Sequence, residues 1–305
     1  MPIPEVEKIW MDGELVDWKE AKVHLLSHSL HYGSGVFEGI RAYETPRGAA
    51  VFRLTDHLKR LFRSAAIYRM SIPYSLEELV EATKVVIRAN GLKSCYIRPI
   101  AFRGYGEMGL HPQAAPVNVA IAVWPWGAYL GEEGIRNGVR AKISSFRRND
   151  PNAIPPAAKA TGQYLNSILA KMEVTEAGYD EAILLNQHGF VADGAGENVF
   201  VVRNGFLYTP PTSSGALEGI TRDSVIRIAE DFEIPFREKE LVRTDLYHAD
   251  EAFFTGTAAE IVPIREVDDR PLGEPGPVTR RIQEKFFAIV KGQDGDYDHW
   301  LEYVD

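Results

Sequence analysis

Apolar and polar positions in the first 125 residues follow two periods, one typical of strands and one of helices. Residues 8–18 predict two strands joined at Asp12-Gly13, because Asp-Gly accommodates the positive φ of a tight hairpin turn. Residues 36–43 and 49–54 predict a second strand pair around a Pro-Arg-Gly turn, and apolar strands are expected over 96–102 and 117–124.

Two helices interrupt these strands. Residues 56–68 place Leu58, Leu61 and Ala65 on one apolar face, with Asp56 as the expected N-cap. Residues 75–90 form a stronger helix, because the spacing of Ser75 and Glu78 is that of a capping box, and Gly91 ends it.

The stretch 125–137 is the best candidate for a linker, since it is rich in glycine and contains a proline. Its Trp and Tyr residues are unusual for a connector, and rings there could cover a cleft or pack on the nearer domain. Beyond it, a helix is predicted over 162–177, and four apolar residues of that helix are expected to face inward: Leu165, Ile168, Leu169 and Met172.

Strands are then predicted over 181–186, over 198–203 with its partner 206–209, and over 251–255. A helix is expected to begin at Thr221, and another covers about 278–291. Because turns and helices both separate the strands, the pattern favours an α+β fold over a doubly wound βαβ series.

Composition narrows the class of protein. The 305 residues suggest two domains, and 45% hydrophobic with 25% charged residues is ordinary globular composition. A net charge of −9 with no basic block disfavours a nucleic-acid partner, and the single cysteine excludes a disulfide framework within the chain. The first ten residues do not resemble a signal peptide, and no apolar run is long enough for a membrane span, so a cytoplasmic protein is expected.

Common catalytic templates are missing from the sequence. There is no phosphate-binding P-loop motif, no dinucleotide-binding glycine motif, and no H-E-x-x-H or G-x-S-x-G. His24, His28 and His31 lie close together without acidic neighbours, so we interpret them as histidines of turns or core and predict no metal site.

Three features of the second half make chemical sense together. Lys159 follows a proline-rich segment, Asp193–Asn198 is an acidic, glycine-rich turn, and Gly219 precedes a helix start at Thr221. Taken singly, each has an ordinary interpretation: a surface lysine, a simple turn and a Thr N-cap. Together they provide an amine for a Schiff base, an acid for a pyridine nitrogen and helix amides for a phosphate, which is what pyridoxal 5′-phosphate needs from a protein.

The sequence resembles the branched-chain amino acid aminotransferases of the class IV (fold type IV) pyridoxal-phosphate enzymes. The resemblance covers essentially the whole chain, with the motifs in order: Ser27-His-Ser-Leu-His-Tyr-Gly33, Val36-Phe-Glu-Gly-Ile-Arg-Ala-Tyr43, Tyr96-Ile-Arg-Pro99, Trp126-Gly-Ala-Tyr-Leu130, Lys159 with Tyr164-Leu-Asn-Ser167, Asp193-Gly-Ala-Gly-Glu-Asn-Val-Phe200, Ala216-Leu-Glu-Gly-Ile-Thr-Arg-Asp223 and Thr255-Gly-Thr-Ala-Ala-Glu260. It implies a fold like that of D-amino acid aminotransferase, with a small N-terminal α/β domain over 1–124, an interdomain loop over 125–137 and a larger, β-barrel-like cofactor domain with helices over 138–305.

The resemblance also implies roles at the cofactor. Lys159 would form the Schiff base and carry the proton between Cα and C4′, and Tyr164 would bond the cofactor's 3′-oxygen. The phosphate would be bound by Arg60, whose ordinary interpretation is a solvated helix face, and by residues of the second half: Leu217, Gly219, Ile220, Thr221 and Thr257.

For the substrate, the resemblance implies two regions. Tyr96 and the amides of Thr257 and Ala258 would receive the α-carboxylate. The side-chain pocket would have apolar walls with polar groups at the rim, where Arg98 and Tyr32 would seat the distal carboxylate of glutamate, and its walls would comprise Tyr32, Phe37, Trp126, Tyr129 and Val36.

The residue before Gly194 departs from the pattern that the resemblance leads us to expect, since a Glu is anticipated there and this chain has Asp193. We expect Asp193 to pair with the pyridine nitrogen through a strand shift or a water, with Glu197 as the fallback.

The activity implied is transamination of leucine, isoleucine and valine with 2-oxoglutarate by a homodimer or larger homo-oligomer. The alternatives are a D-amino acid or (R)-amine transaminase, an aminodeoxychorismate lyase-like enzyme, and a non-catalytic binding module on the same scaffold.

Overall fold

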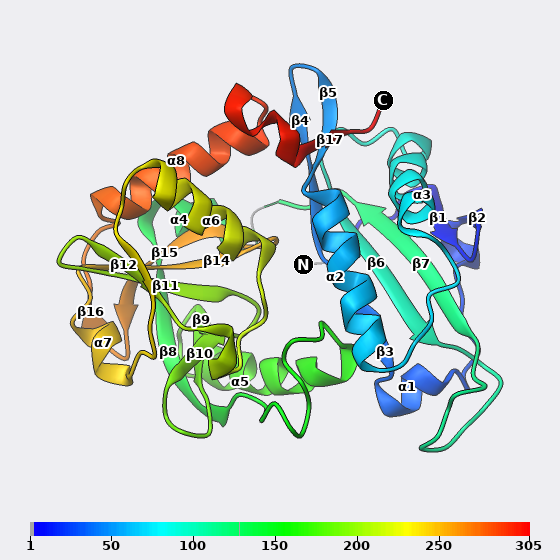
Figure 1. Ribbon diagram of the computed structural model, residues 1–305, viewed down its shortest axis with the longest axis horizontal. Helices are drawn as coiled ribbons and strands as arrows, with labels where there is room; N and C mark the ends of the chain where they lie inside the picture. The colour runs from blue at the N-terminus through cyan, green and yellow to red at the C-terminus, as the bar shows by residue number, and fades with distance from the viewer. Residues whose placement is uncertain (1–2, 128) are drawn as a thin grey trace. The chain divides into compact units, whose positions relative to one another are not determined.

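A computed structural model of the chain describes residues 3–127 and 129–305 and divides them between two compact units (Figure 1). Among the described residues, unit 1 comprises 3–126, 158–162 and 288–305, and unit 2 comprises 127, 129–157 and 163–287. The division after Trp126 lies near the predicted boundary, but Lys159 and the C-terminal 18 residues belong with the first unit, which the predicted division at 124 and 138 did not foresee. Ala128, in the predicted interdomain loop, lies outside the described residues.

Unit 1 is built on an antiparallel sheet with strand order β17-β5-β4-β6-β7-β1-β2, with β3 pairing β6. The hairpin β1–β2 turns at Asp12 and Gly13, which have φ of 48° and 100°, so the predicted turn is confirmed. The strands are β1 (Lys8–Met11), β2 (Glu14–Asp17), β3 (Gly35–Phe37), β4 (Ile40–Thr45), β5 (Gly48–Phe52), β6 (Cys95–Arg103), β7 (Val117–Trp124) and β17 (Leu301–Tyr303).

Helices α2 (Leu54–Ile67) and α3 (Leu76–Ala89) bury their apolar faces in one core with this sheet. The capping box of α3 is present as predicted, with the Glu78 amide donating to Ser75 Oγ and the Ser75 amide donating to Glu78 Oε2. The short helix α1 (His28–Tyr32), two 3-10 turns, η1 (Trp18–Glu20) and η4 (Gly295–Trp300), and the C-terminal strand complete the unit.

The predicted start of α2 is wrong by two residues. The helix begins at Leu54 after Arg53, which has φ of 51°, and Asp56 lies inside the first turn, where it accepts a hydrogen bond from Arg53 Nε at 2.7 Å. A first-turn amide, that of Thr55, donates instead to Glu302 Oε1 at 2.7 Å. Because this partner comes from the far end of the chain, local sequence could not reveal it.

Unit 2 is built on a mixed sheet with strand order β10-β9-β8-β15-β14-β11-β12-β13, and β16 pairs β15. The pairs β8–β9, β8–β15 and β12–β13 are parallel, and the others are antiparallel. Its strands are β8 (Val139–Arg147), β9 (Glu181–Leu185), β10 (Val191–Gly194), β11 (Asn198–Arg203), β12 (Phe206–Thr209), β13 (Phe236–Glu238), β14 (Glu251–Gly256), β15 (Glu260–Val267) and β16 (Arg270–Pro271). The predicted α+β class is therefore confirmed.

The helices of unit 2 connect these strands. They are α4 (Gly131–Asn137), α5 (Tyr164–Glu176), α6 (Ile220–Asp231), α7 (Arg243–Tyr247) and α8 (Pro277–Val290, whose last three residues count with unit 1), with 3-10 turns η2 (Thr161–Gln163, shared between the units) and η3 (Thr212–Ser214). The buried carboxylate of Glu251 accepts the amides of Val278 and Thr279 and so caps α8. None of the helices in residues 3–127 and 129–305 is both long and apolar enough to cross a bilayer.

Helix α5 buries the opposite face from the one predicted. It packs on β8 and β9 through Ser167, Ala170 and Val174, which are spaced along one side. The four large residues that were expected inside are exposed: Leu165 (67%), Ile168 (51%), Leu169 (47%) and Met172 (54%).

Candidate active site

Lys159 lies in unit 1 on a segment whose backbone is fixed on both sides. Its amide donates to Ser64 Oγ at 3.0 Å, and its carbonyl accepts the Phe37 amide at 3.0 Å. Ala158 and Ala160 on either side are buried, and Ala160 forms a β-bridge with Val36. The side chain itself is half-buried, with Nζ 5.1 Å from the centre of the Phe37 ring. This arrangement holds an amine at a defined position beside an aromatic wall.

An aromatic cluster continues from Phe37 in the same unit. The Arg98 guanidinium lies 4.7 Å from the Phe37 ring and 5.3 Å from the Tyr96 ring. The ring centre of Tyr96 in turn lies 4.4 Å from that of Trp126, in an edge-to-face contact, and 5.2 Å from that of Trp124. Four residues predicted for the substrate pocket from the resemblance, Phe37, Tyr96, Arg98 and Trp126, are therefore neighbours, and Lys159 borders them.

Polar groups in this cluster are poised for a ligand. Arg98 Nε is buried and has no hydrogen-bond partner among the described residues, and Arg98 Nη2 donates a long, 3.4 Å bond to Tyr96 Oη. An unpaired buried donor is costly, which favours an anionic group as its missing partner. The Tyr96 hydroxyl lies against Gly39, where a Cβ would be 2.0 Å from Oη, so only glycine permits this position.

Arg60 is buried, not solvated. Its Nε and Nη2 donate to the two carboxylate oxygens of Glu38 at 2.7 and 2.8 Å, and His57 Nδ1 lies 2.7 Å from Glu38 Oε2. Burial opposes ionisation of Glu38, but the charge and hydrogen bonds of Arg60, aided by His57, outweigh it and hold the pKa of Glu38 well below its usual range. Glu38 and His57 were not predicted as site residues.

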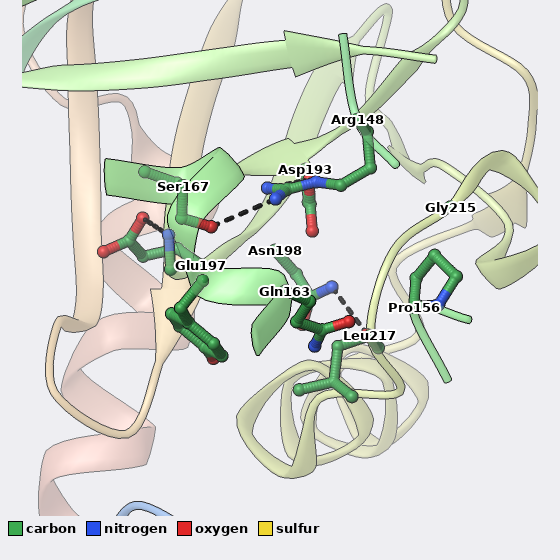
Figure 2. A pocket seen from close by; sticks show the side chains of 12 residues that line it. Arg148, Pro156, Gln163, Ser167, Asp193, Glu197, Asn198, Gly215 and Leu217 are labelled. Atoms are coloured by element: carbon green, nitrogen blue, oxygen red, sulfur yellow. Dashed lines mark hydrogen bonds and ion pairs between the residues drawn. The ribbon is translucent and has the colours of Figure 1, made fainter. Parts of the chain in front are cut away.

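The acidic turn of unit 2 contains two carboxyl groups with different partners. Figure 2 shows Arg148 lying over Asp193. Arg148 Nε donates to Asp193 Oδ1 at 2.7 Å, Nη1 donates to Ser167 Oγ at 3.1 Å, and Nη2 donates to the Gly194 carbonyl at 2.6 Å. Burial raises the pKa of Asp193 to about 6 although Arg148 opposes the shift, so this carboxylate is ionised and paired at neutral pH.

Glu197 also lines this pocket, and its Oε2 accepts the Gly196 amide at 3.0 Å (Figure 2). Burial, reinforced by the charge of Glu181, raises the pKa of Glu197 to about 8. The Gly194 amide donates to the Glu197 carbonyl at 2.7 Å and closes the turn, which was predicted. The structure thus gives Asp193 an arginine partner that the sequence did not indicate, whereas no cation among the described residues is bonded to the Glu197 carboxyl group.

Helix α6 begins with the glycine-led start that the sequence indicated, although one residue earlier than predicted. Gly219 is the N-cap, and glycine has no side-chain oxygen to occupy the first-turn amides, while Thr221 is buried inside the first turn. Asn198 Nδ2 donates to the Leu217 carbonyl at 2.9 Å, and a Cβ on Gly219 would lie 2.0 Å from Asn198 Oδ1. Asn198, which sequence reasoning missed, thereby fixes the loop that leads into α6 (Figure 2). Amides at a helix N-terminus favour a phosphate group.

The other predicted residues of unit 2 lie on other elements than the acidic turn and α6. Thr257 and Ala258 form the turn between β14 and β15, and Tyr164 is the first residue of α5 and lines the pocket with Glu197. Tyr129 is 36% exposed, and the centre of its ring lies 5.7 Å from Lys171 Nζ.

Tyr32, on α1 of unit 1, is 47% exposed, and its ring stacks on that of His28 with the ring centres 4.5 Å apart. His24, His28 and His31 each have hydrogen-bond partners within the chain, as the interpretation of turn histidines requires.

The comparisons with known proteins decide the family. The model of the class IV amino-transferase family matches residues 35–267. The chain belongs to the class IV aminotransferases.

Relatives of this class IV aminotransferase match it over their whole length. The branched-chain-amino-acid aminotransferase of Escherichia coli K12 is 49% identical, covering 100% of both chains. A crystal structure of the Escherichia coli branched-chain amino acid aminotransferase has a TM-score of 0.97 at 49% identity, covering 99% of this chain and 100% of that one. The branched-chain aminotransferase of the archaeon Thermoproteus uzoniensis, solved with norvaline, has a TM-score of 0.95 at 50% identity, covering 98% of this chain and 100% of that one.

Membership of the family confirms the predicted fold type, the transaminase class and pyridoxal 5′-phosphate as its cofactor, and a further branched-chain aminotransferase structure, with a TM-score of 0.96, contains pyridoxamine 5′-phosphate. The residues of the chain fit this group. The glycine-capped start of α6 suits a phosphate, the buried Glu197 carboxyl suits a ring nitrogen, and the Lys159 amine suits an aldehyde carbon.

Proposed function

We propose that this class IV aminotransferase transfers the amino group of L-leucine, L-isoleucine and L-valine to 2-oxoglutarate, giving the branched-chain 2-oxo acids and L-glutamate. The observation that carries the substrate class is the cluster beside Lys159, where aromatic walls surround one incompletely bonded arginine, Arg98. An apolar cage accepts an aliphatic side chain, and a guanidinium at its edge accepts the distal carboxylate of glutamate. The relatives described above, which are named branched-chain aminotransferases, support the same conclusion.

When bound, pyridoxal 5′-phosphate acts as an electron sink that makes the α-proton of the amino acid acidic. Lys159 is the residue we assign to hold the cofactor covalently at rest and then to move the proton between the substrate Cα and the cofactor C4′. Its backbone, bonded to Ser64 and Phe37, fixes the position of the Cα from which the side chain extends. A general base must lie within hydrogen-bond reach of the proton that it moves, and a fixed Cα helps to place the amine there.

The remaining cofactor contacts are assigned by chemistry. Arg60, Thr221, Thr257 and the first amides of α6 would bind the phosphate, and Tyr164 would bond the 3′-oxygen.

For the ring nitrogen we favour Glu197 over Asp193. Both carboxyl groups line the pocket, but that of Asp193 is already paired with Arg148, whereas that of Glu197 accepts a backbone amide. A carboxylate whose charge is partly offset by a cation attracts a protonated ring nitrogen less strongly than an unpaired one does.

The substrate carboxylates are assigned to two places. Tyr96 with the amides of Thr257 and Ala258 would receive the α-carboxylate, and Arg98 with Tyr32 would receive the distal one. Phe37, Trp126, Tyr129 and Val36 would wall the side chain.

We further propose that the protein is a homodimer or larger homo-oligomer. The exposed apolar stripe of α5, formed by Leu165, Ile168, Leu169 and Met172, supports association, because contiguous apolar surface of this kind is typical of interfaces. Light scattering after size exclusion should give at least twice the 34.1 kDa chain mass. Leu165→Asp should lower it toward the monomer, whereas Ile3→Asp, also at an exposed apolar residue, should not; an unchanged mass for Leu165→Asp would reject this face.

Borohydride reduction followed by peptide mapping tests the attachment. The label should appear on the peptide that contains Lys159, and Lys159→Ala should lose both the label and the visible absorbance. A label elsewhere, or turnover retained by Lys159→Ala, would refute the assignment.

A panel of amino donors with 2-oxoglutarate then tests the substrates. Branched-chain L-amino acids should be the best donors, whereas preference for D-amino acids or (R)-amines, or release of an elimination product, would favour the alternative members of the fold.

A further inference from the structure

A fully buried carboxylate lies beside the proposed phosphate ligand, and the proposed function gives it no role. Glu38 follows β3 and has no exposed surface. Its amide donates to the Pro99 carbonyl at 2.9 Å, and its carboxylate accepts Arg60 Nε and Nη2 at 2.7 and 2.8 Å. Two parallel bonds to one edge of a guanidinium fix the plane of that group, not only its charge.

His57 fixes the carboxylate from a third direction. Burial lowers the pKa of His57 despite the opposing hydrogen bond and charge of Glu38, and the charges of Arg60 and Lys159 lower it further. The imidazole is therefore neutral at pH 7. Because an ionised carboxylate can only accept, the bond between His57 Nδ1 and Glu38 Oε2 requires the proton on Nδ1.

The same face of α2 also binds the backbone of Lys159 through Ser64. His57, Arg60 and Ser64 follow one another at spacings of three and four residues, which places them on one side of the helix. Ser64 Oγ accepts the Lys159 amide, and Phe37, the residue before Glu38, donates to the Lys159 carbonyl. The carboxylate, the arginine and the lysine backbone therefore form one connected structure within unit 1.

Stability alone is a weak reason for such a pair. Burying two charges has a large desolvation cost, and apolar residues of similar volume often stabilise a core equally well. The value of the pair must then be sought in what it positions.

We infer that Glu38 is a positioning residue, which holds the Arg60 guanidinium in the orientation that binds the cofactor phosphate. This inference rests on the proposed function, because it uses Arg60 as a phosphate ligand. A purely electrostatic role for Glu38 makes the opposite prediction. Removing a negative charge next to a phosphate site strengthens anion binding by simple electrostatics, whereas releasing the guanidinium from its orientation weakens it. The sign of the effect therefore separates the two roles.

The test is the dissociation constant of pyridoxal 5′-phosphate for Glu38→Gln, measured by equilibrium dialysis of the holoenzyme and read by visible absorbance. The glutamine carbonyl can accept one of the two Arg60 bonds, but its NH2 group would face an N–H donor of Arg60 or His57 in place of an acceptor. We expect the dissociation constant to rise about 10- to 100-fold, as for loss of a charge-assisted bond with a displacement near 1 Å. The phosphorus NMR signal of the bound cofactor should also shift or broaden, because its phosphate contact has changed. A dissociation constant that is unchanged or lower would overturn the inference.

A double-mutant cycle tests whether Glu38 acts through Arg60. Arg60→Met should weaken cofactor binding, and adding Glu38→Gln to it should weaken binding little further. Full additivity of the two effects would overturn the inference, and so would tight binding by Arg60→Met.

Glu251→Gln is the matched control, because Glu251 is another buried carboxylate, bonded to the α8 amides of Val278 and Thr279. It should destabilise the fold while leaving the cofactor dissociation constant unchanged; if it weakens cofactor binding as much as Glu38→Gln, a general loss of stability explains both. Where Glu38→Gln does not fold, Glu38→Asp provides the measurement. It keeps the charge but is one methylene too short to bond both Arg60 nitrogens, and undiminished affinity would overturn the inference.

The outcomes also separate the two proposals. Absence of a borohydride label on Lys159 in the wild-type protein would remove the proposed function and this inference together. A labelled wild type with weak binding in Arg60→Met but normal binding in Glu38→Gln would remove only the role of Glu38.

Discussion

Gly219→Ala is the most direct perturbation of the proposed phosphate site. The backbone of Gly219 has φ of −69° and ψ of 134°, which alanine adopts without strain, so the substitution acts through space alone. The new Cβ would be 2.0 Å from Asn198 Oδ1 and 3.2 Å from Arg222 Cβ, whereas real contacts of this kind do not fall below 3.0 Å. Either Asn198 or the start of α6 must therefore move by about 1 Å.

Both possible movements affect the same loop. If Asn198 retreats, the Leu217 carbonyl loses the 2.9 Å bond that fixes the loop before α6. If α6 retreats, the first-turn amides move away from the phosphate directly. Overpacking of this kind costs about 1–3 kcal/mol of stability. A misplacement near 1 Å costs about 100-fold in a positioned interaction, so we expect a rise of one to two orders of magnitude in the cofactor dissociation constant.

The assay is cofactor dissociation measured together with urea unfolding of each variant. Gly295→Ala is the control, because a Cβ there meets nothing within 4 Å, and it should change the unfolding free energy by less than about 0.5 kcal/mol. The double variant Asn198→Ala with Gly219→Ala should be no worse than Asn198→Ala alone, since the colliding oxygen is gone. Normal cofactor affinity in Gly219→Ala, or full additivity in the double variant, would refute the reasoning.

Three further predictions concern the two carboxyl groups of unit 2 and the substrate cluster. Arg148→Met should cost about 3–5 kcal/mol, because it leaves Asp193 buried without its cation. Burial already raises the pKa of Asp193 to about 6, and the loss of Arg148 raises it further. The deficit in unfolding free energy of Arg148→Met relative to the wild type should therefore widen as pH rises above about 6. A deficit independent of pH would contradict this. With the pKa of Glu197 raised to about 8, cofactor affinity should be constant below that pH and fall about tenfold per pH unit above it. The reason is that, above that pH, binding must take up the proton that Glu197 would share with the ring nitrogen. In a titration series, Glu197→Gln should abolish the slope. Gly39→Ala should raise KM for amino acids while leaving the cofactor dissociation constant unchanged, because its Cβ displaces the Tyr96 hydroxyl, and steady-state kinetics with an unaltered KM would exclude a role for that hydroxyl.

Local patterns predicted the elements that local interactions determine. The capping box of Ser75 and Glu78 and the hairpin turn at Asp12-Gly13 involve residues that are close in sequence, so their chemistry is visible without the fold. The start of α2 shows the limit of such reasoning, because Glu302, which bonds the Thr55 amide, is 247 residues away.

The face of α5 that packs inward could not be predicted from hydrophobicity. Both sides of the helix carry apolar residues, and the larger ones predict burial by size alone. The sheet instead receives the side with the smaller residues Ser167, Ala170 and Val174. Hydrophobicity alone therefore does not select the face of this helix that packs on the sheet.

In the candidate site, too, sequence neighbours indicated some residues, whereas others depend on partners that are distant in the sequence. Lys159 and the glycine-led start of α6 were indicated by neighbouring residues, but Glu38 and Arg148 were not, because they lie 22 and 45 residues from their partners Arg60 and Asp193. The role of an acidic residue depends on those distant partners.

Asp193 and Glu197 occupy one turn and differ by one methylene, yet their roles follow from their neighbours. Asp193 meets a guanidinium, so its charge serves to join β8, β10 and α5 through Arg148. Glu197 meets a backbone amide and the repelling charge of Glu181, so its carboxyl binds a proton more tightly than a solvated one does. A group in that state gains most from a partner that brings a positive charge into the pocket, because pairing relieves the cost of burial. A protonated ring nitrogen would be such a partner for Glu197, and Asp193, already paired with Arg148, would gain less from it.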